Sequence, residues 1–141
     1  MQFDIWLGGD IDIAVFAAWV TAYFEEMGLP TELTEGTYRL TFCCPRLALS
    51  FDNDPEDAAF RNEQAGSLLR DWGVTVSDTT AIDGQLYASC DNAAFAKMIQ
   101  YLLDKTDADF FLGSEFWEWI LYRRNGELFV HDEWKMYFYA V

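Results

Sequence analysis

The chain has 141 residues, of which 52% are hydrophobic and 18% aromatic, and its 24 acidic residues outnumber its 9 lysines and arginines, which gives a net charge of −15. Acidic chains with few apolar residues stay disordered because they bury too little surface to offset chain entropy, and this composition excludes that class. A folded protein with so negative a surface repels nucleic acids and anionic membranes, and it associates faster with a basic partner.

The length is that of one domain, and no run rich in Ser, Gly or Pro divides it, so we predict a single domain over 1–141. The first basic side chain is Arg39, so the acidic N-terminus lacks the Lys or Arg of a signal peptide, and no apolar run approaches the ~18 residues of a membrane span. The three cysteines suit reduced thiols better than a disulfide framework. We therefore expect a cytoplasmic protein.

The N-terminal half alternates strands with two helices. Residues 3–7 predict a first strand, and Asp10 or Asp12 is expected to cap a helix that ends at Met27 before Gly28. That helix is apolar nearly all round, which suits a helix sandwiched in the core better than one docked on a partner.

A hairpin and a second helix follow. Residues 37–43 and 46–52 alternate between apolar and polar and are separated by Pro45, which predicts an antiparallel hairpin. Asp54 and Pro55 then begin a helix over 55–72. With a further strand from Val74, the order β-α-β-β-α-β suggests a ferredoxin-like arrangement of the N-terminal half.

The C-terminal half predicts two hairpins and one helix. Asp83-Gly84 is expected to turn the chain between strands over 74–82 and 85–90, and Asp91 to cap a helix over 91–104. Asn125-Gly126 predicts a hairpin between 116–123 and 127–133. The expected fold is thus α+β, with three helices packed on a mainly antiparallel sheet.

A two-residue turn at Asn125-Gly126 sets the pairing of the last hairpin. One face is then expected to carry four opposed pairs: Arg124 with Glu127, Tyr122 with Phe129, Ile120 with His131, and Glu118 with Glu133. The other face is more apolar and is expected to cover the core through Trp117 with Trp134, Trp119 with Asp132, Leu121 with Val130, and Arg123 with Leu128.

The opposed pair Glu118 and Glu133 allows two interpretations. Like charges that face each other in a sheet are destabilising. Either the strand bends before Glu133, or an arginine such as Arg39 pairs with the glutamates, and the pair is structural. Alternatively, the face with Tyr122, Phe129 and His131 is a partner-binding site that awaits a cation, or one glutamate has a raised pKa and serves as an acid or base.

Catalytic and metal-binding motifs are missing from the sequence. His131 is the only histidine, which excludes most metal sites and most Ser-His or Cys-His systems. The run from Asp52 to Asp54 lacks the glycine and glutamate of a calcium loop and fits a helix cap better. We therefore expect a binding protein without a metal or cofactor. An enzyme that uses Glu118, His131 and Glu133 is the alternative.

The closing segment WEWILYRRNGELFVHDEW, a hydrophobic hairpin followed by an acidic aromatic stretch, resembles the immunity proteins of bacterial polymorphic-toxin and contact-dependent inhibition systems. The resemblance is one of size, acidity and pattern, and it implies an inhibitor that binds a cognate toxin with a basic cleft. A nucleic-acid mimic that inhibits DNA-binding enzymes remains an alternative. So does an oligomeric accessory protein, for example a homodimer that uses the first helix or the aromatic C-terminus.

Overall fold

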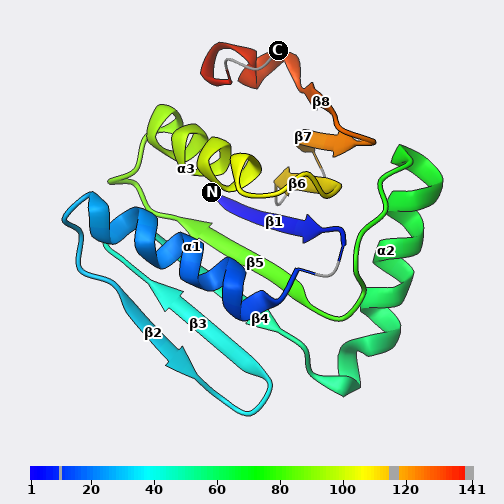
Figure 1. The fold of residues 1–141 in the computed structure, drawn as a ribbon, viewed down its shortest axis with the longest axis horizontal. Helices are drawn as coiled ribbons and strands as arrows, with labels where there is room; N and C mark the ends of the chain where they lie inside the picture. The colour runs from blue at the N-terminus through cyan, green and yellow to red at the C-terminus, as the bar shows by residue number, and fades with distance from the viewer. Residues whose placement is uncertain (10, 115–117, 139–141) are drawn as a thin grey trace.

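The computed structural model describes residues 1–9, 11–114 and 118–138, and in these residues eight strands form one antiparallel sheet. The order across the sheet is β2-β3-β4-β5-β1-β6-β7-β8, so β1 lies near the centre and β2 and β8 lie at opposite edges (Figure 1). The strands are β1 Gln2–Leu7, β2 Glu32–Glu35, β3 Arg39–Cys43, β4 Leu47–Asp52, β5 Ala81–Leu86, β6 Phe110–Ser114, β7 Trp119–Arg124 and β8 Glu127–Val130.

The described residues also form α-helices and short 3₁₀ helices, namely α1 Ile13–Glu26, η1 Pro55–Asp57, α2 Ala58–Trp72, α3 Asn92–Asp104 and η2 Asp132–Tyr137. The predicted α+β class with an antiparallel sheet is therefore confirmed. Each of the three predicted segments is helical, but η2 was not expected, so the predicted count of three helices does not describe the structure. None of these helices combines the length and apolarity needed to cross a membrane.

The helix ends follow from local side-chain chemistry. The carboxylates of Asp12 and Asp91 accept hydrogen bonds from the backbone N–H groups of Ala14 and Ala94, at 2.8 and 2.7 Å. Asp54 does the same for Glu56 at the start of η1. Each bond satisfies a donor that has no partner within its helix, so each fixes the residue at which the helix begins.

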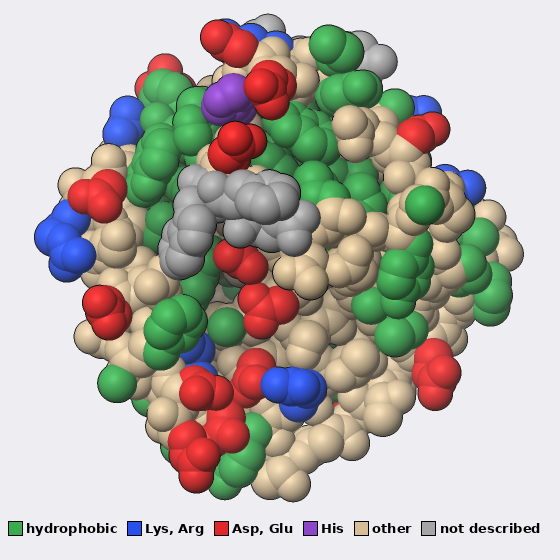
Figure 2. Space-filling view, turned by 180° about the vertical axis from the view of Figure 1, so that it is seen from behind, with side chains coloured by type: hydrophobic (Ala, Val, Ile, Leu, Met, Phe, Trp, Pro, Cys, Tyr) green, Lys and Arg blue, Asp and Glu red, His purple; other side chains and the backbone are tan. Residues whose placement is uncertain are grey.

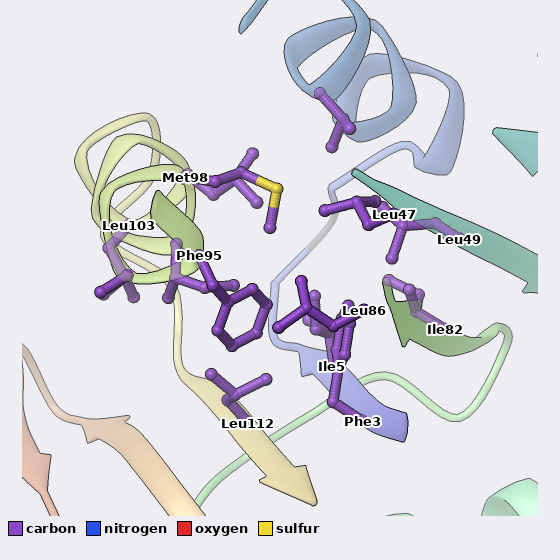
Figure 3. Close-up of a cluster of buried hydrophobic side chains, with 14 of the residues drawn as sticks. Phe3, Ile5, Leu47, Leu49, Ile82, Leu86, Phe95, Met98, Leu103 and Leu112 are labelled. Atoms are coloured by element: carbon purple, nitrogen blue, oxygen red, sulfur yellow. The ribbon is translucent and has the colours of Figure 1, made fainter. Parts of the chain in front are cut away.

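α1 and α3 lie across one face of the sheet and bury the main core (Figure 1). In Figure 3, Phe95 and Met98 of α3 point toward the apolar residues that β1 and β4 present to the same side. α1 contributes Phe16 and Phe24 to this core, whereas the side chain of Val15 is 45% exposed. The helix is thus a covering layer rather than one sandwiched on all sides.

The opposite face of the sheet is covered only in part. α2 packs Leu68 and Trp72 against Trp6 of β1 and Phe111 of β6. Over β4, in contrast, every second residue is only partly buried, as expected for an antiparallel sheet with one wetted face. We call the part of this face that α2 does not cover the open face.

The predicted turn at Asp83-Gly84 is wrong. β5 runs straight through both residues, and Gly84 lies directly opposite Phe3 of β1. A Cβ atom on Gly84 would lie 2.1 Å from the Phe3 ring, so the glycine makes room for a buried aromatic side chain rather than for a turn.

The ferredoxin-like arrangement is not confirmed either. In that arrangement β1 would pair with β4, the second strand of the first hairpin, whereas here β5 is inserted between them and pairs with both. The order of elements along the chain is compatible with both topologies, which differ in whether β1 or β5 pairs with β4.

We expect Gly84→Ala to lower the free energy of unfolding by about 1–3 kcal/mol, because Phe3 is 1% exposed and has no space to move away from a new methyl group. The matched control is Gly66→Ala in α2. There the nearest atom is the mobile end of Arg70, and replacing a helical glycine should raise stability by about 0.5–1 kcal/mol. Denaturant unfolding of both variants checks the opposite signs, and equal effects would contradict the packing argument.

Candidate functional site

The hairpin of β7 and β8 turns at Asn125-Gly126, as predicted. Both residues have positive φ angles, 51° and 81°, which is the backbone that a two-residue turn of this kind requires. Arg124 faces Glu127, and Tyr122 faces Phe129, with the two rings stacked at 4.8 Å. The first pairs of the predicted register are therefore confirmed.

The predicted pairing of Glu118 with Glu133 is wrong. β8 ends at Val130, and after one more backbone hydrogen bond, from His131 N–H to the Ile120 carbonyl, the chain enters η2. The His131 ring caps this helix, since its Nδ1 accepts a hydrogen bond from the Glu133 backbone N–H at 3.3 Å. Because the chain bends here, Glu133 lies in a helix and cannot face Glu118 across a sheet.

A bulge also changes which side chains of β7 face the core. The pairing with β6 slips between Leu112 and Gly113, so that Ile120 and Leu121 are both buried in the main core. Trp119 instead packs with Tyr122 on the α2 side. The predicted core placement of Leu121 and Val130 is confirmed, that of Trp119 is wrong, and Trp117 lies outside the described residues.

The structure nevertheless gathers the predicted site residues around His131. A hollow of about 400 Å³ is lined by Glu118, His131 and Glu133 together with Trp119, Trp134 and Tyr137, and we call it the His131 hollow. Tyr122 and Phe129 line an adjacent hollow of about 340 Å³ that shares Trp119 and His131. The five predicted residues therefore line two adjacent hollows, although Glu118 and Glu133 are not paired across strands as predicted.

Tyr122 and Phe129 also have a clear structural role. The guanidinium of Arg124 lies 4.8 Å from the Phe129 ring centre and 5.7 Å from that of Tyr122, and it donates a hydrogen bond to the Trp72 carbonyl at 2.9 Å. This contact ties the hairpin to the end of α2.

Other arginines likewise bind backbone carbonyls. Arg61 is 4% exposed and donates to the carbonyls of Asp54 and Asp78. Arg123 donates at 2.7–2.9 Å to three carbonyls, those of Leu103, Thr106 and Ala108. These arginines therefore hold loops in place through backbone carbonyls, and they form no ion pair with a described carboxylate.

Arg39, the predicted alternative partner of the glutamates, pairs with Asp52 instead, at 2.9 Å. Lys135 pairs with Asp132 at 2.9 Å. Within the described ranges these are the two ion pairs of the protein, so most of its negative charge has no neutralising contact.

An opposed pair of carboxylates does exist, in a place that the sequence did not predict. Asp4 of β1 faces Asp83 of β5, and the same row across the open face continues through Ser50 of β4 to Thr41 of β3. A groove of about 330 Å³ lies over this row, and no lysine or arginine is among the described residues that line it. In Figure 2 acidic side chains spread down the middle of this side of the molecule, and the basic ones lie mainly toward its rim.

The pair changes the acidity of Asp4. Partial burial, a hydrogen bond with the Asp83 side chain and the negative charge of Asp83 together raise the pKa of Asp4 from 3.8 to about 7. Asp4 can therefore hold or release a proton near neutral pH. The alternation of Phe3, Asp4 and Ile5 would have placed Asp4 on the polar face, but its partner depends on the register of β5.

The chemistry available at the two sites is mainly that of binding. No group of three potential metal ligands occurs in the part of the chain that the structure describes. His131 uses Nδ1 to cap η2, which leaves only Nε2 to contact a ligand. Glu118, His131 and Glu133 do share one hollow, so the acid-base alternative keeps its geometry but loses one of the histidine's two nitrogens.

Comparison with protein-family models, with curated proteins and with solved structures found no significant match, so function is inferred from the sites alone.

We expect Asp4→Asn to raise the free energy of unfolding at pH 8. A carboxyl whose pKa rises on folding holds its proton more tightly in the folded state, so stability falls as pH increases from about 4 to about 7. The variant removes this loss, and its advantage should be largest above pH 7 and vanish near pH 4. Because Asp4 is only partly covered and water screens its interaction with Asp83, the gain should be at most about 1 kcal/mol.

Asp52→Asn on the same face is the control of opposite sign. The hydrogen bond and charge of Arg39, with a backbone hydrogen bond from Asp54, lower the pKa of Asp52. The ionised carboxylate of Asp52 stabilises the fold above its unfolded pKa of about 3.8, and this contribution disappears as pH falls through its lower pKa in the folded state. Asp52→Asn should therefore reduce the free energy of unfolding at neutral pH. Urea unfolding of both variants between pH 4 and pH 8 checks the contrast. A gain for Asp4→Asn that does not vary with pH would contradict it.

Proposed function

We propose that this chain is an acidic binding protein that inhibits a basic protein partner, in the manner of bacterial immunity proteins that neutralise a toxin in the cytoplasm. The single observation that carries the proposal is the unneutralised charge. Among the described residues two carboxylates form ion pairs, while Arg61, Arg123 and Arg124 bind backbone carbonyls. Charge left in this state lowers the stability of the free protein, and a basic partner would offset that cost.

The proposed interface is the side of the molecule shown in Figure 2, where the histidine (purple) lies beside acidic side chains. It includes the predicted binding residues that line the His131 hollow and the hollow beside it, namely Glu118, Tyr122, Phe129, His131 and Glu133. Aromatic side chains that are held in place and surrounded by charge are typical of the residues that dominate binding energy, because they add buried area without losing much conformational freedom. Asp4 and Asp83 extend the charged area over the open face.

A nucleic-acid mimic is the second candidate, and one observation favours it. The acidic side chains in Figure 2 extend down the face rather than forming one compact patch. A mimic presents carboxylates along a line, as a duplex presents phosphates. Its partner would be a DNA-binding enzyme, and DNA would displace the protein from that enzyme.

The proposal is tested by affinity capture from the native host at ~10 mM and ~150 mM salt, because the Debye length falls from about 30 Å to about 8 Å over this range. We expect a basic protein whose association slows markedly at the higher salt. DNA that competes for the captured protein would favour the mimic. A partner whose association rate is independent of salt would assign the charge to solubility and contradict the proposal.

Glu118→Gln should leave the free energy of unfolding unchanged or slightly higher, because Glu118 is exposed and has no ion pair with a described residue. The same change should weaken binding to the captured partner by about 1–3 kcal/mol if a charged hydrogen bond is lost. Glu32→Gln at the far edge of the sheet is the matched control and should leave binding nearly unchanged. Lower stability with unchanged binding would assign Glu118 a structural role.

A further inference from the structure

The walls of the His131 hollow combine aromatic rings with carboxylates. Trp119, Trp134 and Tyr137 line it together with Glu118 and Glu133. Aromatic faces carry negative electrostatic potential, so rings and carboxylates in one hollow attract positive charge and repel anions. The volume of about 400 Å³ lies within the range of small-ligand sites.

Contacts with other side chains fix the aromatic rings that line the hollow. Trp134 packs edge-on against the buried ring of Phe95 in α3, with 5.9 Å between the ring centres, and its ring centre lies 5.6 Å from that of Tyr137. Trp119 contacts the His131 ring at 5.1 Å, and His131 is itself fixed by the hydrogen bond from Glu133 N–H. A ligand would therefore find rings already in place, which lowers the entropy cost of binding.

The nearby positive groups are engaged elsewhere. Lys135 pairs with Asp132 at 2.9 Å, and the terminal ammonium of Met1, which also lines the hollow, donates to the Leu86 carbonyl at 3.1 Å. No lysine or arginine lines the hollow among the described residues, and none of them pairs with Glu118 or Glu133. The two carboxylates thus form no ion pair with a described residue, and the Met1 ammonium is the one described cation among the residues that line the hollow.

We propose that the His131 hollow is a cage for an organic cation, in which the rings contact the apolar stem and the face of the cation while Glu118 and Glu133 supply the negative charge. The cation is either the end of a lysine or arginine side chain of a partner, or a free amine of similar size. The first source rests on the proposed function, whereas the second would make the hollow a small-molecule site in its own right.

The first test compares choline with 3,3-dimethylbutan-1-ol, which has the same shape without the charge. Binding is followed by NMR through the indole N–H signals. Choline should shift the signals of Trp119 and Trp134 and leave that of Trp19 in α1, outside the hollow, unchanged. We expect it to bind at least roughly tenfold more tightly than the alcohol. Equal binding of the two compounds, or shifts that exclude both lining tryptophans, would overturn the proposal.

The carboxylates are tested with the double variant Glu118→Gln/Glu133→Gln. It should reduce the preference for choline over the alcohol severalfold, because it removes the charge of the two carboxylates and keeps the shape of the hollow and its aromatic rings. Glu32→Gln/Glu35→Gln is the matched control, since it removes the same charge from β2 at the opposite edge of the sheet. Equal loss in both double variants would show that the net charge, and not the hollow, attracts the cation, and would overturn the proposal.

The source of the cation is distinguished with end-blocked tripeptides that carry lysine, arginine or neutral norleucine between glycines. Tighter binding of the lysine or arginine peptide than of choline supports a partner side chain, and the reverse supports a free amine. If a cation binds but no basic partner is captured from the host, the cage stands and the proposed inhibitor function fails. If a partner binds in a salt-dependent way but no cation shifts the indole signals, the cage fails and the inhibitor function stands.

Discussion

The contact between Phe3 and Gly84 determines the arrangement at the centre of the sheet. Phe3 occupies the space that a side chain at position 84 of β5 would fill, so the observed pairing of β1 with β5 requires a glycine there. That register places Ile5 opposite Ile82 under the helices and Asp4 opposite Asp83 on the open face. Because side chains alternate between the faces of a sheet, the packing that completes the core also brings two carboxylates together.

Several of the positive side chains stabilise the fold and do not neutralise the acidic residues. A chain with nine lysines and arginines could neutralise only part of its 24 acidic residues. Here several arginines donate hydrogen bonds to backbone carbonyls instead of pairing with carboxylates. Arg123 closes the loop before β6, and Arg124 joins the last hairpin to α2. The fold therefore leaves negative charge on its surface, which favours fast association with a basic partner over maximal stability of the free protein.

The two candidate sites differ in what they offer a ligand. The groove over Asp4 and Asp83 is lined by short side chains such as Ser50 and offers a ligand mainly negative charge. The pKa of Asp4 is raised to about 7, so part of that charge depends on pH near neutrality. The His131 hollow presents charge and rigid aromatic surface together. Charge by itself gives orientation and speed of encounter, whereas buried aromatic area gives affinity, so the hollow is the better candidate for the centre of an interface.

Local chemistry was readable in the sequence. Asp12, Asp54 and Asp91 cap helices because each short carboxylate accepts a hydrogen bond from a backbone N–H only two or three residues later in the chain. Asn125-Gly126 turns the chain because both residues tolerate positive φ, and this set the pairing as far as Leu121 with Val130. Three residues of the His131 hollow, Glu118, His131 and Glu133, were also named from this short-range register, although the two glutamates meet in a hollow rather than across strands. The aromatic residues of its wall were not assigned to it.

Contacts between distant segments were decided only by the tertiary structure. Asp83-Gly84 has the composition of a turn, but the Phe3 ring, some 80 residues away along the chain, makes it part of a straight strand. The pairing of Asp4 with Asp83 follows from that contact and has no local signal. The bulge at Ile120 likewise arises where β7 pairs with β6, and η2 is held against α3 by the contact of Trp134 with Phe95. A periodic pattern shows which side of a strand is buried, whereas the identity of the neighbour depends on how the whole core packs.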